Sequence, residues 1–253
     1  ASDVYKRQFH WFGIIGIAYS LILMFALREN PAHNIKKTNI PINNTEKKIS
    51  LFSGLSVLFS TWAFWIILFY FAAPSLPGWA TKNWLPTLFS ETLNIPMSEA
   101  GPISTITIAV SSFIGVIVGG ILSDRWVQKN IRGRVYTGAI GLGMTIPALM
   151  LLGFGESFMA VVGAGLLFGI GFGIFDANNM PILCQFISAK YRGTAYGIMN
   201  MTGVFAGAAV TEQLGKWTDG GNLGIGFALL SIVVLAALLL QVYFLRPKTD
   251  NME

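Results

Sequence analysis

Seven long apolar stretches constrain the fold of this chain more than any other feature. They cover residues 9–27, 51–73, 103–122, 135–154, 158–186, 193–214 and 223–245. A helix that crosses a bilayer needs ~20 mostly apolar residues, and these stretches match that length. Only 11% of the 253 residues are charged, which is too few to cover a soluble globule of this size. The pattern predicts an all-α membrane protein, because helices satisfy their own backbone hydrogen bonds in lipid.

The basic residues are distributed unevenly among the connections between these stretches. Thirteen of the 17 Lys and Arg residues lie in alternate connections and in the C-terminal tail, whereas the other connections hold only Lys82 and Lys216. Basic residues concentrate in cytoplasmic loops of membrane proteins. We therefore expect a multi-pass protein of the bacterial inner membrane with a cytoplasmic C-terminus. The net charge of +5 follows from this loop pattern and does not indicate nucleic-acid binding.

The sequence also divides into segments. Residues 1–8 are polar and resemble a translated adapter more than a native terminus, so we exclude them from the fold prediction. Residues 28–50 are basic and rich in Asn and Pro, which is typical of a cytoplasmic linker, and residues 74–100 are expected to form the longest outside loop. The chain does not begin with Met and shows no signal peptide. We interpret it as a fragment whose start lies upstream.

Small residues recur at four-residue spacing in three of the apolar stretches. Such a spacing places them on one helix face, where two backbones approach closely. We also expect Asn200 to hydrogen-bond between helices, since polar side chains in membrane spans often do. The small residues are Ser111, Gly115, Gly119 and Ser123, then Gly165, Gly169 and Gly173, then Gly203 and Gly207.

Two of the predicted cytoplasmic loops carry recognisable motifs. Residues 119–125 read Gly-Gly-Ile-Leu-Ser-Asp-Arg and residues 132–134 read Arg-Gly-Arg. Together they resemble the major facilitator loop motif Gly-x-Leu-Ala-Asp-Arg-x-Gly-Arg. Residues 191–197 read Tyr-Arg-Gly-Thr-Ala-Tyr-Gly, which resembles the family's Arg-Gly-x-Ala-x-Gly motif. The inserted residues 126–131 leave open which Arg pairs with Asp124.

The chain thus resembles the C-terminal half of a major facilitator superfamily transporter. This resemblance implies that residues 9–27 are helix six of the N-terminal bundle and residues 28–50 are the central cytoplasmic loop. Residues 51–246 would be the C-terminal six-helix bundle of a twelve-helix fold, residues 247–253 a cytoplasmic tail, and the missing N-terminal bundle a partner. The implied loop-motif and gating residues are Gly120, Asp124, Arg125, Arg132, Arg134, Arg192 and Gly193.

Within that family, the chain is most similar to the anion:cation symporter and sugar-acid branch. The similarity rests on residues 176–181, Asp-Ala-Asn-Asn-Met-Pro, and residues 84–86, Trp-Leu-Pro. It implies that the solute is a sugar, a sugar acid or another organic anion.

A few polar and aromatic residues inside the stretches are candidates for solute binding or ion coupling. Asp176 is the only acid well inside a stretch, and Asn179 follows it by one turn. An acid at that depth is costly unless it faces a cavity or a partner, so Asp176 either couples a proton or makes a structural hydrogen bond. Trp62, Trp65 and nearby Tyr70 either face the cavity or pack against neighbours. Glu212 is expected to pair with Lys216 at i,i+4.

These observations favour secondary active transport of a small organic solute by alternating access. The predicted partners are the lipid bilayer, the solute and a co-transported proton or sodium ion. Two alternatives remain: a non-transporting sensor or assembly subunit on the same fold, and a membrane-embedded transferase. We expect no enzyme, cofactor or metal site, since the sequence shows no Ser/His/acid set, no phosphate-binding loop and one cysteine, Cys184. No Lys or Arg lies deep in a predicted stretch, so a cation for an anionic solute would come from the missing half.

Overall fold

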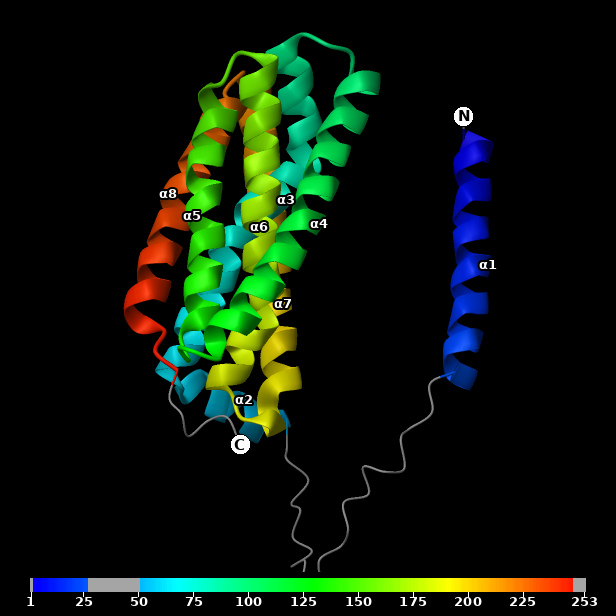
Figure 1. The fold of residues 1–253 in the computed structure, drawn as a ribbon. Helices are drawn as coiled ribbons and strands as arrows, with labels where there is room; N and C mark the ends of the chain where they lie inside the picture. The colour runs from blue at the N-terminus through cyan, green and yellow to red at the C-terminus, as the bar shows by residue number, and fades with distance from the viewer. Residues whose placement is uncertain (1, 27–50, 248–253) are drawn as a thin grey trace, which may run out of the picture. The chain divides into compact units, whose positions relative to one another are not determined.

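The computed structural model describes residues 2–26 and 51–247 (Figure 1). The chain divides into two units, residues 1–48 and 49–253. In the first unit, α1 (Ser2–Ala26) is a single helix that includes seven of the eight residues set apart by their sequence. Its window Phe9–Ala26 is long and apolar enough to cross a membrane. The predicted linker 28–50 lies outside the described residues.

The second unit is a bundle of helices whose long axes run side by side (Figure 1). Among its described residues, all the longer helices except α7 are apolar and long enough to cross a membrane. The chain is therefore an integral, multi-pass membrane protein with an all-α fold. The elements are α2 (Leu51–Ser60), α3 (Trp62–Leu93), α4 (Met97–Val127), α5 (Gly133–Phe154), α6 (Phe158–Phe186), η2 (Ala189–Tyr191), α7 (Arg192–Asp219) and α8 (Leu223–Phe244).

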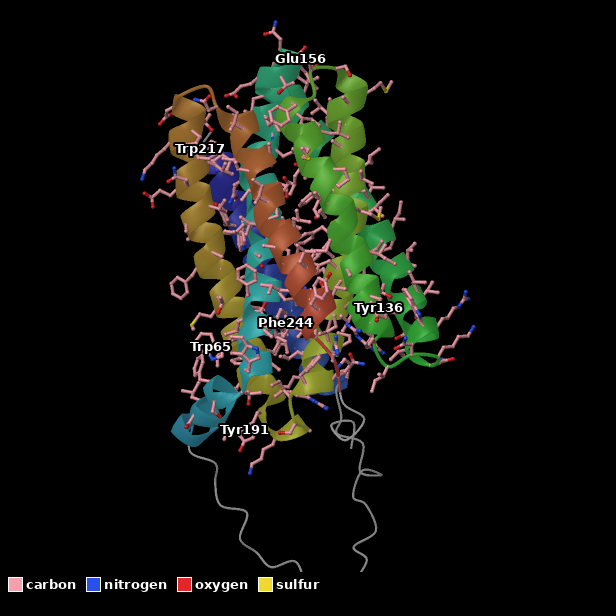
Figure 2. All side chains as sticks on the ribbon, turned by 90° about the vertical axis from the view of Figure 1, so that its left-hand side faces the viewer. Trp65, Tyr136, Glu156, Tyr191, Trp217 and Phe244 are labelled. Carbon is pink, nitrogen blue, oxygen red and sulfur yellow. The ribbon has the colours of Figure 1, made fainter. Side chains whose placement is uncertain are left out.

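Helix α6 lies at the centre of the packing. It packs against both α4 and α5, α5 also packs against α8, and α3 packs against α7 and α8. Fully buried aromatic side chains fill the space between them: Phe64, Phe89, Phe168, Phe175 and Phe227. In Figure 2, Glu156 and Trp217 lie at one end of the bundle, and Trp65 and Tyr191 lie at the opposite end, which also carries α2.

Several of the predicted small-residue positions lie where two backbones meet. A Cβ atom added at Gly119 on α4 would lie 2.7 Å from the Cα atom of Ile174 on α6. Cβ atoms added at Gly115 and Gly173 would likewise overlap backbone of the facing helix. These glycines allow α4 and α6 to approach at a distance that any larger residue would prevent.

The predicted outside loop at residues 74–100 is wrong. The structure continues α3 to Leu93 with Pro74, Pro77 and Pro86 inside the helix. Only the residues between α3 and α4 form the turn, which begins at Asn94 in the left-handed conformation (φ 52°). Neighbouring helices can stabilise a proline-containing membrane helix, so proline alone does not end it.

The predicted span 51–73 is also not one helix. It is interrupted at Thr61, where α2 ends and α3 begins, and Thr61 has extended backbone angles. The indole Nε1 of Trp65 donates a hydrogen bond of 2.9 Å to the carbonyl oxygen of Phe59. This bond satisfies a carbonyl group at the end of α2 that no longer has a helical partner.

Candidate functional site

A pocket of about 200 Å³ opens between α3, α6 and α7. An apolar cavity of ~150 Å³ is large enough for a six-carbon ring, so this pocket has the size of a small organic molecule. Its lining combines polar side chains with aromatic rings and small residues. The polar residues are Ser75, Lys82, Asp176 and Asn200, and the aromatic residues are Phe71, Trp79, Phe172 and Phe175.

The two charged residues of the pocket come from different helices. Lys82 lies on α3 and Asp176 on α6, both line the pocket, and no direct ion pair joins them in the part of the chain that the structure describes. The ammonium group of Lys82 lies over the ring of Trp79, 5.1 Å from the ring centroid. Such a cation–π contact holds the ammonium in place without neutralising its charge. The pocket therefore offers one positive and one negative group to a ligand.

Neighbouring hydrogen bonds hold both charged residues in position. The amide Nδ2 of Asn179, which is only 3% exposed, donates to Oδ1 of Asp176 over 3.1 Å. Next to Lys82, Nδ2 of Asn83 donates to Oγ1 of Thr211 over 2.9 Å, and the indole of Trp84 donates to the carbonyl of Thr211 over 3.1 Å. These bonds join α3 to α7 at the turn that carries Lys82.

Glycines make room for the aromatic walls. A Cβ atom added at Gly203 would lie 2.6 Å from Cε1 of Phe71, and one added at Gly207 would overlap the indole of Trp79. Gly78 faces Phe172 in the same way, with 2.7 Å from an added Cβ atom to Cζ. The spacing of Gly203 and Gly207 on α7 thus shapes the pocket.

Lys82 is the functional candidate that sequence reasoning missed. In the sequence, Lys82 falls in the predicted outside loop, and no basic residue lies deep in a predicted stretch. The structure places it inside α3, on the wall of the pocket. The expected absence of a cation from these spans is therefore wrong. Trp79 and Asn83 are four residues apart, which is the spacing of neighbours on one helix face, and this could have indicated that the helix continues. The prolines on both sides of Lys82, Pro77 and Pro86, favoured a loop instead.

Asn200 also lines the pocket. Its Nδ2 donates over 2.9 Å to the carbonyl of Tyr196 on its own helix, and its side chain is exposed. Among the described residues it makes no hydrogen bond to another helix, so its predicted role between helices stays a prediction.

The aromatic candidates lie away from this pocket. Trp62 and Trp65 are 72% and 50% exposed near the end that carries α2. Tyr70 is 1% exposed and packs edge-on against Phe175, with 5.1 Å between the ring centroids. Its hydroxyl group has no hydrogen-bond partner among the described residues. Of the five predicted solute or coupling residues, Asp176 lies at the pocket and Asn179 supports it.

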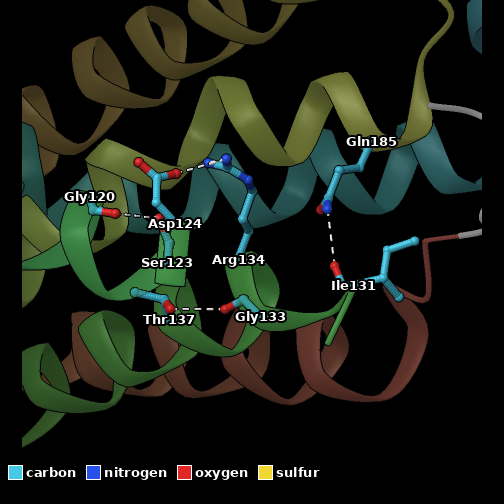
Figure 3. Close-up of polar contacts among 8 residues, drawn as sticks. All are labelled: Gly120, Ser123, Asp124, Ile131, Gly133, Arg134, Thr137 and Gln185. Atoms are coloured by element: carbon cyan, nitrogen blue, oxygen red, sulfur yellow. Dashed lines mark hydrogen bonds and ion pairs between the residues drawn. The ribbon is translucent and has the colours of Figure 1, made fainter. Parts of the chain in front are cut away.

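The loop motif forms a second polar site, at the end of the bundle that carries α2. Figure 3 shows Asp124 of α4 facing Arg134 of α5, and the distance from Oδ1 to Nη2 is 2.9 Å. This contact identifies Arg134 as the partner that the sequence left open. Nearby, Oγ of Ser123 donates to the carbonyl of Gly120, and Nε2 of Gln185 on α6 donates to the carbonyl of Ile131.

The other predicted motif residues take different positions. Arg132 donates to the carbonyl of Val242 on α8 and lies over the ring of Tyr136. Arg192 donates to the carbonyls of Cys184 and Ile187, over 3.0 Å each, and so satisfies groups at the C-terminal end of α6.

The three remaining motif residues are Arg125, Gly120 and Gly193, and of these Gly120 accepts the hydrogen bond from Ser123 through its carbonyl oxygen. Arg125 lies in the last turn of α4. Gly120 and Gly193 have nothing within 4 Å of an added Cβ atom.

The predicted pair on α7 is confirmed. Nζ of Lys216 lies 2.7 Å from Oε1 of Glu212, and both side chains are exposed. Among the described residues, no three His, Cys, Asp or Glu side chains come together as metal ligands. Chemically, the pocket is suited to bind a small anion at Lys82 and to hold a proton or a cation at Asp176.

The chain is similar in sequence to proteins named as transporters. The family model described as Major Facilitator Superfamily matches residues 8–211. The probable anion transporter 3, chloroplastic, of Oryza sativa subsp. japonica is 25% identical, over 87% of this chain and 45% of its own length. The cis,cis-muconate transport protein of Acinetobacter baylyi is 24% identical, over 67% and 40%. The citrate-proton symporter of Klebsiella pneumoniae is 22% identical, over 93% and 51%. The chain spans about half the length of these curated relatives.

Proposed function

The chain belongs to the major facilitator superfamily, and on this basis we propose that it serves secondary active transport of small organic anions by alternating access. The relatives are named as transporters of anions, muconate and citrate. The observation that carries the proposal is the position of Lys82 on the wall of a small pocket between α3, α6 and α7. A charged side chain at membrane depth is expensive and is retained where it faces a cavity or a partner.

In this proposal, Lys82 binds a carboxylate of the solute. The ring of Trp79 keeps the ammonium group at the pocket, and Asn200 offers a neutral hydrogen-bonding group beside it. The pocket also holds Asp176, whose carboxylate competes with the solute for the same ammonium group. Binding of an anion is therefore favoured when Asp176 is protonated. This linkage supplies a reason for co-transport of a cation that neutralises Asp176, and the relative named a citrate-proton symporter favours a proton.

The proposal also assigns the segments of the chain to parts of a complete transporter. Residues 9–27 would serve as helix six, residues 51–246 as the C-terminal bundle, and an N-terminal bundle would close the other side of the cavity. The basic loops and the C-terminus would face the cytoplasm of a bacterial cell. There, the pair of Asp124 and Arg134 would form a latch whose breaking changes the balance between two conformations.

Binding to the purified chain tests the central point. We expect citrate, muconate or another carboxylate to change the intrinsic tryptophan fluorescence, because Trp79 lies against Lys82. Lys82→Gln should weaken the binding about 10- to 150-fold, since a hydrogen bond to a charged group contributes ~1.5–3 kcal/mol.

The matched control removes the same charge elsewhere. Lys216→Gln breaks an exposed pair with Glu212 outside the pocket and should leave the affinity unchanged. Equal weakening in both variants would indicate a general charge effect. Unchanged binding in Lys82→Gln would refute the proposal.

A further inference from the structure

A second pocket, of about 480 Å³, lies between α3 and α4 and also includes Lys82 in its lining. Its apolar lining residues are Pro86, Ile108, Ala109, Phe113 and Val116, and the hydroxyl-bearing residues Thr81, Ser104, Thr105 and Ser112 also line it. It is more than twice as large as the pocket that holds Asp176. The two pockets differ in chemistry and meet at one side chain.

Lys82 is suited to join them because it is amphipathic. A lysine has an apolar stem of four methylene groups and a charged head, and the two ends can face different surroundings. The head lies over Trp79, which lines the polar pocket. An anion bound at that head can extend its remaining atoms along the stem into the apolar pocket.

We propose that the pocket between α3 and α4 is a specificity subsite that takes the apolar body of an organic anion whose carboxylate binds Lys82. The inference rests on the proposed function and narrows its substrate class to carboxylates with an aliphatic or aromatic body. A compact polyanion such as citrate fills only the polar pocket and leaves the apolar one empty. A solute with an apolar body of several carbons buries that body against Phe113 and Ile108.

The ring of Phe113 is 67% exposed, which is ordinary for an apolar side chain on a helix that spans a membrane and does not by itself indicate a ligand. A lipid acyl chain is the competing occupant, but it has no need of a cation at the end of its groove. A carboxylate at Lys82 accounts for both the charge and the apolar walls.

Binding to the purified full chain in phosphatidylcholine nanodiscs tests the inference. The probes are acetate, butanoate, hexanoate, 3-phenylpropanoate and citrate, with hexanol as the neutral analogue. We expect the affinity to rise with chain length, by about fourfold per fully buried methylene group. Hexanol should bind far more weakly than hexanoate.

Filling the groove gives the decisive variant. Ala109 is exposed and lines the groove, so Ala109→Phe fills it without disturbing the core. This variant should bind acetate as before, but hexanoate and 3-phenylpropanoate should no longer bind more tightly than acetate. Val110, the next residue, is 53% exposed and lies outside the lining, so Val110→Phe should still bind the longer anions more tightly than acetate.

The outcomes separate the two proposals. If anions bind but the affinity does not rise with chain length, the apolar subsite is wrong and the anion site stands. The apolar subsite is also wrong if Ala109→Phe still binds hexanoate more tightly than acetate to the same degree. It is wrong as well if hexanol binds as tightly as hexanoate, which is the result expected of a groove for lipid acyl chains. If no anion binds at all, both proposals fail.

Discussion

Two adjacent glycines on α4 allow a precise test of how the bundle is packed. A Cβ atom added at Gly119 would lie 2.7 Å from Cα and 3.0 Å from the carbonyl oxygen of Ile174 on α6. A Cβ atom added at Gly120 would have nothing within 4 Å. Both residues stand in the loop motif, but the four-residue spacing predicted helix packing for Gly119 alone. The structure predicts opposite effects for Gly119→Ala and Gly120→Ala.

The expected magnitudes follow from these distances. Carbon atoms in contact prefer about 3.5–4.0 Å, so Gly119→Ala requires α4 and α6 to separate by about 1 Å. The obstacle is backbone, which cannot rotate away as a side chain can. Overpacking of this kind costs ~1–3 kcal/mol. Ala favours the helix over Gly by ~0.5–1 kcal/mol, which offsets part of the overpacking cost in Gly119→Ala. In Gly120→Ala there is no overpacking, so the same preference stabilises the folded protein by ~0.5–1 kcal/mol.

Thermal unfolding in detergent measures the difference. The chain's single cysteine, Cys184, is half-buried on α6, so a thiol-reactive fluorophore can report unfolding. At ~2–4 °C per kcal/mol for a domain of this size, the two variants should differ in Tm by several degrees, with Gly119→Ala the less stable. Equal Tm values would refute the close approach of α4 and α6 at Ile174.

Three further predictions concern transport. Asp176→Asn in the complete transporter should retain anion exchange but lose uptake driven by a pH gradient in vesicles; gradient-driven uptake that stays intact would refute proton coupling at Asp176, and no uptake by the unaltered transporter would favour the non-transporting alternative. Asp124→Asn should lower the free energy of unfolding by less than ~1 kcal/mol, because Asp124 is 66% exposed, and should still reduce the rate of uptake. The charge-exchanged pair Asp124→Arg with Arg134→Asp should then recover part of that rate. Residues 1–253 alone should show no uptake in vesicles, and uptake by them would contradict the need for a second bundle.

Much of the fold could be predicted because membrane solvation leaves few choices. Apolar length predicted membrane-spanning helices, and residue spacing predicted the glycines that meet backbone between α4 and α6. The motif resemblance identified the region of Asp124 but not its partner. The partner depends on where α4 ends and α5 begins, at Val127 and Gly133, and helix ends are the least predictable feature of a sequence.

The candidate site could be predicted only in part, for a related reason. Asp176 stood out because an acid inside an apolar stretch is rare, whereas Lys82 was hidden by the residues around it. Pro77 and Pro86 flank it, and in soluble proteins such prolines end helices. In the bundle, α3 instead continues for another 20 residues beyond Ala73, about 30 Å of helix at 1.5 Å per residue. This length moves Lys82 from a predicted outside loop to the wall of the pocket, where the proposed anion site would account for its charge.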